Sequence, residues 1–216
     1  MDFLSWALGV GTSAAITIAA HYMARLHRSY YIFKPLTTVL ILALALFAAP
    51  GTGSFHAWAI RAGLIFSLVG DVLLMLPGEH FVQGLGAFLL AHLCYIFAFA
   101  PGIGAQAFAA SLLPMLATGL LGVTYLWGSV PRKLRIPVAA YAAVISLMAA
   151  CAIGQRLTTP SASSTAAAAG ALVFVMSDAL LAVNRFRHPF RAAQGLLLTC
   201  YFAGQFLIAW SIRSSF

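Results

Sequence analysis

The sequence predicts an all-α integral membrane protein, built as one bundle of about eight transmembrane helices. Of its 216 residues, 62% are apolar and only 7% are charged, and the mean hydropathy is +0.98, which does not describe a soluble domain. The apolar residues form about eight segments near the ~20 residues that cross ~30 Å of hydrocarbon. They lack the alternating polarity of barrel strands, so an outer-membrane barrel is disfavoured.

We expect the spans at residues 3–22, 35–49, 58–76, 81–99, 107–127, 134–153, 164–184 and 192–212. The amino terminus carries Asp2 and lacks a basic leader, so residues 3–22 are expected to be a retained helix and not a cleaved signal peptide. Pro35 would open the second span. Turn residues fill four of the gaps: Pro50-Gly51-Thr52-Gly53, Pro77-Gly78, Pro101-Gly102 and Thr159-Pro160-Ser161. Pro131 and Pro137 bracket a basic bend at the start of the sixth span, and no linker divides residues 1–216 into domains.

The distribution of basic residues predicts the orientation, because such residues are retained on the cytoplasmic side. Nine flank the first, third, fifth and seventh connections, namely Arg25, Arg28, Lys34, Arg132, Lys133, Arg135, Arg185, Arg187 and Arg191. The opposite side carries three, Arg61, Arg156 and Arg213. Both termini are therefore expected on the non-cytoplasmic side, and the short loops suit a bacterial inner membrane. The net charge of +8 is then explained by this orientation and by attraction to anionic lipid headgroups. No nucleic acid partner is expected.

Two acidic residues are the main indication of function. Asp71 and Asp178 lie inside apolar spans, although the chain contains only four Asp and Glu residues. An ionisable side chain near the middle of a spanning helix costs roughly 2.5 to 3.5 kcal/mol on insertion scales, so such residues usually face a cavity and serve a function. The alternative for each is a structural hydrogen bond between helices. With the predicted topology, their helices run in the same direction and place both carboxyls at one depth near the cytoplasmic end.

The sequence around the two carboxyls is similar. Gly63 and Gly170 each stand eight residues before the Asp, and Gln-Gly-Leu opens the next span at residues 83–85 and 194–196. This pattern indicates two related four-helix halves in parallel orientation, an arrangement that places sites at the interface of the repeats.

Other polar residues could join the carboxyls: Lys34, His92, Tyr95, Tyr141, Asn184, Tyr201 and Gln205. His92 and Tyr95 lie on one face of the fourth span, and Tyr201 and Gln205 on one face of the eighth. Tyr or Gln side chains also bond across helices as structural contacts, whereas an imidazole such as that of His92 is costly inside the membrane. Lys34, at the expected cytoplasmic start of the second span, could bind a lipid phosphate or extend to the surface beside Pro35.

Neither a metal nor a cofactor is predicted. A metal-dependent hydrolase needs about three His or carboxylate ligands, and only His92, Asp71 and Asp178 could converge. No CxxC spacing occurs among the three cysteines, Cys94, Cys151 and Cys200.

Several of these residues form motifs along the whole chain: Lys34-Pro35-Leu36, Phe66-Ser67 with Gly70-Asp71, Gly84-Leu85 through Phe88 to His92 and Tyr95, and Gly170-Ala171 with Phe174 and Ser177-Asp178. In content and order they resemble the YhhN family of membrane proteins, which includes lysoplasmalogenases. The resemblance implies hydrolysis of the vinyl ether bond of a lysoplasmalogen. The products would be a fatty aldehyde and glycerophosphoethanolamine or glycerophosphocholine, and the expected partners are a lysophospholipid substrate and membrane lipid.

Two carboxyls suit that reaction. Cleavage begins with proton transfer to the outer alkene carbon, which produces an oxocarbenium ion, and continues with water attack and collapse of the hemiacetal. One acid and one base are required, as in glycosidases, and two carboxyls in a low-dielectric cavity would supply a protonated and an ionised group. Asp71 and Asp178 would divide these roles in either order. The other polar side chains would orient water or the ether oxygen, and Lys34 would meet the phosphate.

The main alternative is a proton-coupled transporter or channel. Such proteins also use paired intramembrane carboxylates and often consist of repeated halves, so Asp71 and Asp178 would then form a proton relay. The oligomeric state is not predicted.

Overall fold

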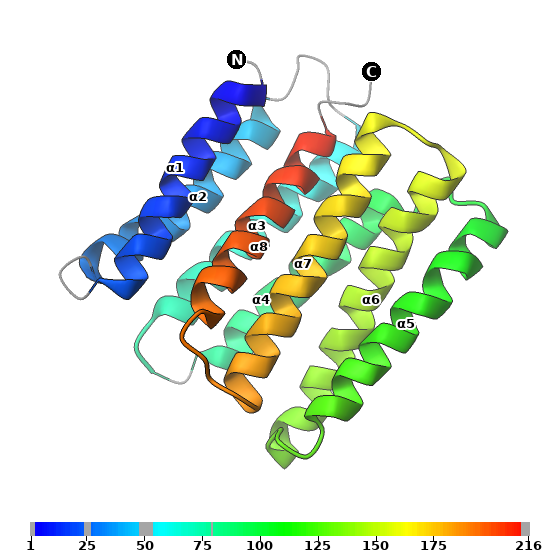
Figure 1. The fold of residues 1–216 in the computed structure, drawn as a ribbon. Coiled ribbons are helices and arrows are strands. Elements are labelled where there is room, and N and C mark those ends of the chain that lie inside the picture. Colours follow the sequence, from blue (N-terminus) through cyan, green and yellow to red (C-terminus); the bar gives the residue numbers. More distant parts are fainter. Residues whose placement is uncertain (1–2, 24–26, 48–53, 79, 213–216) are drawn as a thin grey trace.

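The computed structural model describes residues 3–23, 27–47, 54–78 and 80–212. Within these ranges it has eight helices long and apolar enough to cross a membrane. They are α1 (Phe3–Tyr22), α2 (His27–Leu46), α3 (Phe55–Met75), α4 (Phe81–Phe99), α5 (Ala105–Leu126), α6 (Arg135–Thr158), α7 (Ala162–Phe186) and α8 (Ala193–Ser211), with a short 3-10 helix η2 (Arg132–Leu134) before α6. Consecutive helices alternate in direction, so α1 begins and α8 ends at the same end of the bundle (Figure 1). The predicted all-α membrane bundle is confirmed.

Local chemistry explains several helix ends. The Ser54 hydroxyl accepts the backbone N–H of Ala57 at the start of α3, and Ser161 and Ser164 form a reciprocal capping box at the start of α7. Gly78 and Gly102 have φ of 116° and 78°, a conformation that glycine adopts without a Cβ penalty. The expected turns at these glycines and at Ser161 are therefore observed. The turn expected at residues 50–53 lies outside the described residues.

The start of the second helix differs from the prediction. We expected Pro35 to open this span, but α2 begins at His27 and Pro35 lies inside it. A proline removes one backbone N–H from a helix, and transmembrane helices tolerate it where neighbouring groups compensate. The expectation was wrong by two helical turns, and the consequence is that Lys34 lies within the helix and not at its end.

Six helices close a ring. Contacts join α2 to α3, α3 to α4, α4 to α6, α6 to α7, α7 to α8 and α8 back to α2. The remaining two lie outside this ring on opposite flanks: α1 packs on α2 and α8, and α5 packs on α6 and α7 (Figure 1). The interior of the ring is therefore shielded from lipid by protein on every side, which is where polar side chains are tolerated.

The contacts of the two halves largely repeat each other. Helices α1, α2, α3 and α4 of the first half correspond to α5, α6, α7 and α8 of the second. Four contacting pairs, α1·α2, α2·α3, α3·α4 and α2·α8, therefore correspond to α5·α6, α6·α7, α7·α8 and α4·α6. All eight pairs are in contact. The outer helices break the pattern, because α1 contacts α8 whereas α5 contacts α7. The arrangement agrees with the two related halves that the sequence indicates, and it places α3 and α7 in equivalent positions.

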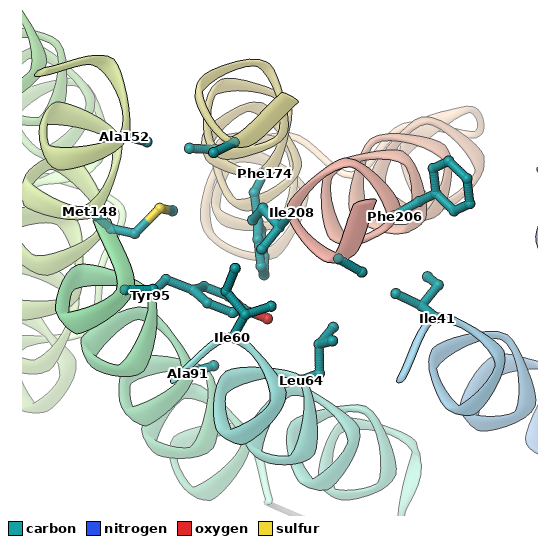
Figure 2. Packing of buried hydrophobic residues seen from close by; sticks show 14 of the residues in the cluster. Ile41, Ile60, Leu64, Ala91, Tyr95, Met148, Ala152, Phe174, Phe206 and Ile208 are labelled. Carbon is teal, nitrogen blue, oxygen red and sulfur yellow. The ribbon is translucent and has the colours of Figure 1, made fainter. Parts of the chain in front are cut away.

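Aromatic and aliphatic side chains fill the ring at mid-depth. Tyr95, Ile60 and Ile208 meet between α3, α4 and α8, with Phe174 reaching them from α7 (Figure 2). The two glycines of the sequence repeat allow this packing. A Cβ at Gly63 would overlap the Tyr95 ring, and one at Gly170 would lie 2.8 Å from the carbonyl oxygen of Gly204. This core separates one end of the ring from the other.

Candidate functional site

Both intramembrane carboxyls line one cavity of about 400 Å³ at the end of the ring that holds the α3–α4 and α7–α8 connections. We call this space the carboxyl cavity. Its walls come from α2, α3, α4, α7 and α8, and the lining residues are Tyr30, Lys34, Asp71, Leu74, Phe81, Phe88, Ser177, Asp178, Leu181, Asn184, Arg185, Pro189, Gln194, Leu197 and Tyr201. Pro189 belongs to the α7–α8 connection, so the cavity extends from the spanning region to the bundle end.

Asp71 is fully engaged by its neighbours. Its Oδ2 accepts hydrogen bonds from the Thr38 hydroxyl at 2.6 Å and from the Tyr201 hydroxyl at 2.7 Å. Its Oδ1 lies 3.3 Å from the Lys34 ammonium nitrogen, which is also 3.5 Å from the Asp71 carbonyl oxygen. Only 1% of the Asp71 side chain is exposed. Burying two charges is costly unless they are paired and hydrogen-bonded, and this pair satisfies both conditions.

Asp178 has a different environment. Its Oδ2 accepts a hydrogen bond from the Tyr141 hydroxyl at 2.6 Å, and the same oxygen lies 3.2 Å from His92 Nε2. His92 Nε2 is also 2.9 Å from the Tyr141 oxygen. No lysine or arginine of the described residues is within ion-pair distance of Asp178, and its Oδ1 accepts no hydrogen bond there. The side chain is 14% exposed and lines the carboxyl cavity, so Asp178 is the more accessible of the two carboxyls.

The two carboxyls receive their donors from equivalent helices. Asp71 on α3 is bonded from the preceding helix α2 and from α8, and Asp178 on α7 is bonded from the preceding helix α6 and from α4. In the two related halves, α3, α2 and α8 correspond to α7, α6 and α4, so the two carboxyls have equivalent neighbouring helices. The geometry is therefore repeated, but the chemistry is not, since only the Asp71 site includes an ammonium group.

The structure separates the remaining predicted site residues into two groups. Tyr141, His92 and Tyr201 contact a carboxyl, and Asn184 lines the carboxyl cavity while its Oδ1 accepts the Phe190 N–H at 3.4 Å. By contrast, Tyr95 and Gln205 are buried and bond to each other.

The Tyr95 hydroxyl donates to Gln205 Oε1 at 2.6 Å. Neither side chain lines the carboxyl cavity. Their bond instead joins α4 to α8 within the core, next to the rings of Phe99 and Phe174.

Lys34 differs most from expectation. We considered that it could extend to the membrane surface from a helix end. In the structure it is 5% exposed and directed at Asp71, so the surface placement is wrong. The reason is the earlier start of α2, which moves Lys34 into the ring.

Thr38 and the residues at the cavity mouth were not predicted from the sequence. Lys34 and Thr38 are four residues apart, so on one continuous helix they face the same side, and this spacing could have identified Thr38. Arg185 and Gln194 line the mouth, and the Arg185 guanidinium lies 5.0 Å from the centre of the Phe81 ring. Arg185 had been counted only as a topology signal.

The arrangement can perform proton chemistry beside an anionic group. The carboxyl cavity has a partly exposed carboxyl (Asp178), an ion pair with no net charge (Lys34 and Asp71) and an arginine (Arg185) at its mouth. Such a cavity can hold a polar, phosphate-bearing molecule and exchange a proton with it. Among the described residues, His, Cys, Asp and Glu side chains do not gather in groups of three that could hold a metal ion. His92 contacts Asp178, whereas Asp71 contacts Lys34.

Comparison with known proteins identifies relatives over most of the chain. The YhhN family profile matches residues 29–212. The chain is 31% identical over 205 residues to an uncharacterized membrane protein YhhN from Escherichia coli O6:H1, covering 95% of this chain and 97% of that protein.

Two further relatives are named as enzymes. Lysoplasmalogenase TMEM86B from Homo sapiens is 34% identical over 182 residues, covering 82% of this chain and 73% of that protein. A lysoplasmalogenase from Mycobacterium bovis is 34% identical over 161 residues, covering 71% and 59% respectively. No solved structure matches the chain.

Proposed function

Because the chain belongs to the YhhN family of membrane proteins, and relatives at 31–34% identity are named lysoplasmalogenases, we propose that it hydrolyses the vinyl ether bond of lysoplasmalogens. The products are a fatty aldehyde and a glycerophospho-alcohol, such as glycerophosphoethanolamine or glycerophosphocholine. The single observation that carries the proposal is the carboxyl cavity, which is lined by the partly exposed carboxyl Asp178 together with Lys34 and Arg185. A phosphate-bearing lipid with an acid-labile bond fits that combination.

Asp178 is the proton donor in this proposal. Among the described residues, no lysine or arginine lies within ion-pair distance of this carboxyl, and its side chain is the more exposed of the two. Asp178 transfers its proton to the outer alkene carbon, and the alkene electron pair forms the new C–H bond. The remaining carbon and the ether oxygen share the positive charge as an oxocarbenium ion. His92 and Tyr141, both bonded to Oδ2, hold the carboxyl in place during this transfer.

The same group then acts as the base. Water attacks the oxocarbenium carbon, and the Asp178 carboxylate takes a proton from that water, which restores the acid and leaves a hemiacetal. This change from acid to base follows the pattern of retaining glycosidases. When the hemiacetal collapses, the bond from carbon to the glycerol oxygen breaks. The hemiacetal hydroxyl proton is lost to solvent, the glycerol oxygen gains one, and the fatty aldehyde is released.

Asp71 and Lys34 supply a fixed electrostatic environment. The Asp71 carboxylate lines the same cavity as Asp178 and its negative charge favours the oxocarbenium ion, while Lys34 prevents an uncompensated buried charge. We expected the two carboxyls to divide the acid and base roles; in this proposal Asp178 takes both, and Asp71 supplies fixed charge. Arg185, with Asn184 and Gln194 at the mouth, meets the phosphate group.

We further propose that the cavity mouth faces the cytoplasm. Most of the basic residues flank the α1–α2, α3–α4, α5–α6 and α7–α8 connections, and the carboxyl cavity reaches this end of the bundle. Both termini then lie on the non-cytoplasmic side, in a bacterial inner membrane.

The decisive experiment is mass spectrometric detection of free fatty aldehyde from a defined lysoplasmalogen, using purified protein in detergent. An ester-linked lysophospholipid of equal chain length is the substrate control, and Asp178→Asn is the enzyme control. We expect aldehyde from the wild type with the vinyl ether substrate only. A folded wild type that releases none contradicts the proposal, and proton flux in liposomes without lipid cleavage would instead support a transporter.

A further inference from the structure

A second, apolar hollow lies behind Asp178. It has a volume of about 140 Å³ and is enclosed by α5, α6 and α7, with Met115, Val123, Ile145 and Val175 among its walls. We call it the lateral groove. Its few polar lining groups do not demand a polar ligand: the Thr118 hydroxyl, for example, donates to the Pro114 carbonyl oxygen of its own helix at 2.8 Å.

The lateral groove and the carboxyl cavity share Asp178. This residue lines both hollows, and Tyr141, which donates a hydrogen bond to Asp178, lines the groove. A molecule that passes from one hollow to the other therefore passes the exposed carboxyl. On one side of this point the walls carry Lys34 and Arg185, and on the other they are apolar.

The outer wall of the groove faces the membrane. Helix α5 lies at the edge of the bundle (Figure 1), and only Ser111 and Leu126 of its 22 residues are buried. Gly119 and Gly122 of α5 line the groove without side chains. At Gly122 a Cβ would meet nothing within 4 Å, so the groove is open there.

We propose that the lateral groove binds the alkenyl chain of the lysoplasmalogen, which enters sideways from the lipid past α5, while the glycerophosphate group occupies the carboxyl cavity. This inference rests on the proposed function. It places the vinyl ether, which joins chain to glycerol, beside Asp178. The carbon to be protonated is on the chain side of that bond. A lipid chain suits the groove better than a partner helix, since an extended chain is much narrower than a helix about 10 Å wide.

Blocking the groove tests the proposal. Gly122→Phe adds a ring to the open space in the groove, and Ala182→Leu narrows it from α7 if the first variant does not fold. Gly9→Phe is the matched control, because Gly9 is an exposed helical glycine of α1 with nothing within 4 Å and no part in either hollow. Turnover of hexadecenyl and butenyl lysoplasmalogens is measured for each protein after size-exclusion chromatography.

We expect the ratio of hexadecenyl to butenyl turnover to fall by about tenfold or more in Gly122→Phe, because an apolar subsite discriminates strongly by fit, and to stay unchanged in Gly9→Phe. An unchanged ratio in folded Gly122→Phe and Ala182→Leu would overturn the proposal. So would an equal fall in the Gly9→Phe control, since this would indicate a general effect of added surface bulk.

A binding measurement separates this inference from the proposed activity. A non-hydrolysable ether lysophospholipid with a diazirine in its chain is photo-crosslinked to the wild type and the labelled peptides are mapped. Labels on the facing residues of α5, α6 and α7 that disappear in Gly122→Phe support the groove even if no lysoplasmalogen is cleaved. Labels elsewhere, or labels that Gly122→Phe does not affect, contradict the groove even if cleavage occurs.

Discussion

The two carboxyl sites of this protein occupy equivalent helices but bind different partners. Asp71 is held by one ammonium and two hydroxyl groups and has 1% of its side chain exposed, whereas Asp178 is held by a hydroxyl and an imidazole on one oxygen and has 14% exposed. Only Asp178 also faces the lateral groove. The difference teaches that similar sequence around two intramembrane acids does not imply equal surroundings; the proposed function assigns fixed charge to the first site and proton transfer to the second.

The largest expected effect is on turnover at Asp178. Replacing it by Asn keeps the shape and removes the transferable proton, so we expect kcat for lysoplasmalogen to fall by about 10²- to 10⁴-fold, the usual contribution of a general acid or base. Thermal unfolding should change little, because no buried cation depends on this carboxyl. Aldehyde release and unfolding in the same detergent check both statements. Wild-type turnover in Asp178→Asn would contradict the role of proton donor.

The next effect concerns stability at Asp71. Asp71→Asn leaves the buried Lys34 ammonium without its counter-charge, and breaking a buried pair in this way costs about 3–5 kcal/mol. We expect a clear loss of thermal stability, and partial recovery when Lys34→Met is added, because the double variant buries no unpaired charge. Equal stability of wild type and Asp71→Asn would contradict the contrast between the two sites.

A matched pair of tyrosines sharpens the comparison further. Tyr141 and Tyr201 each donate one hydrogen bond to a carboxyl Oδ2, at 2.6 Å and 2.7 Å. A hydrogen bond to a charged group, such as that of Tyr201 to the ion-paired Asp71, is worth about 1.5–3 kcal/mol. We expect Tyr141→Phe to lower kcat by about tenfold or more with modest loss of stability, because its partner reacts. Tyr201→Phe should mainly lower the unfolding temperature. The measurements are kcat and the unfolding temperature of both variants. A larger loss of kcat in Tyr201→Phe than in Tyr141→Phe would exchange the roles of the two sites.

The smallest expected effect is at the cavity mouth. Arg185 is exposed, so its contact with a phosphate is screened by water and salt, and Arg185→Gln should raise KM only about two- to fivefold. The difference should shrink at high salt while kcat stays near the wild-type value. Lys133→Gln, an exposed basic residue of η2 outside the cavity, is the control. A salt-independent change would argue against a phosphate contact.

Much of the fold could be predicted from the sequence, since a spanning helix requires a long apolar segment and turn residues separate successive helices. The error at α2 arose from Pro35, which normally marks a helix start but lies inside a spanning helix here. That single boundary displaced Lys34 by two turns and concealed Thr38 as a partner of Asp71. Tyr95 and Gln205 were predicted near the carboxyls because they share helix faces with His92 and Tyr201, yet they bond to each other.

By itself, the sequence determined that this is an eight-helix membrane protein, that Asp71 and Asp178 are its exceptional residues, and that its motifs resemble those of the YhhN family. These properties follow from the amino-acid composition, the spacing of residues and the order of motifs. Each of these can be read along the chain without knowing which helices are neighbours. Only the tertiary structure decided which groups each carboxyl meets and that Asp178 lines both a polar cavity and an apolar groove. The physical reason is that Lys34, His92, Tyr141 and Tyr201 come from four different helices, and a charge inside a bundle is controlled by the neighbours that helix packing brings within hydrogen-bond distance.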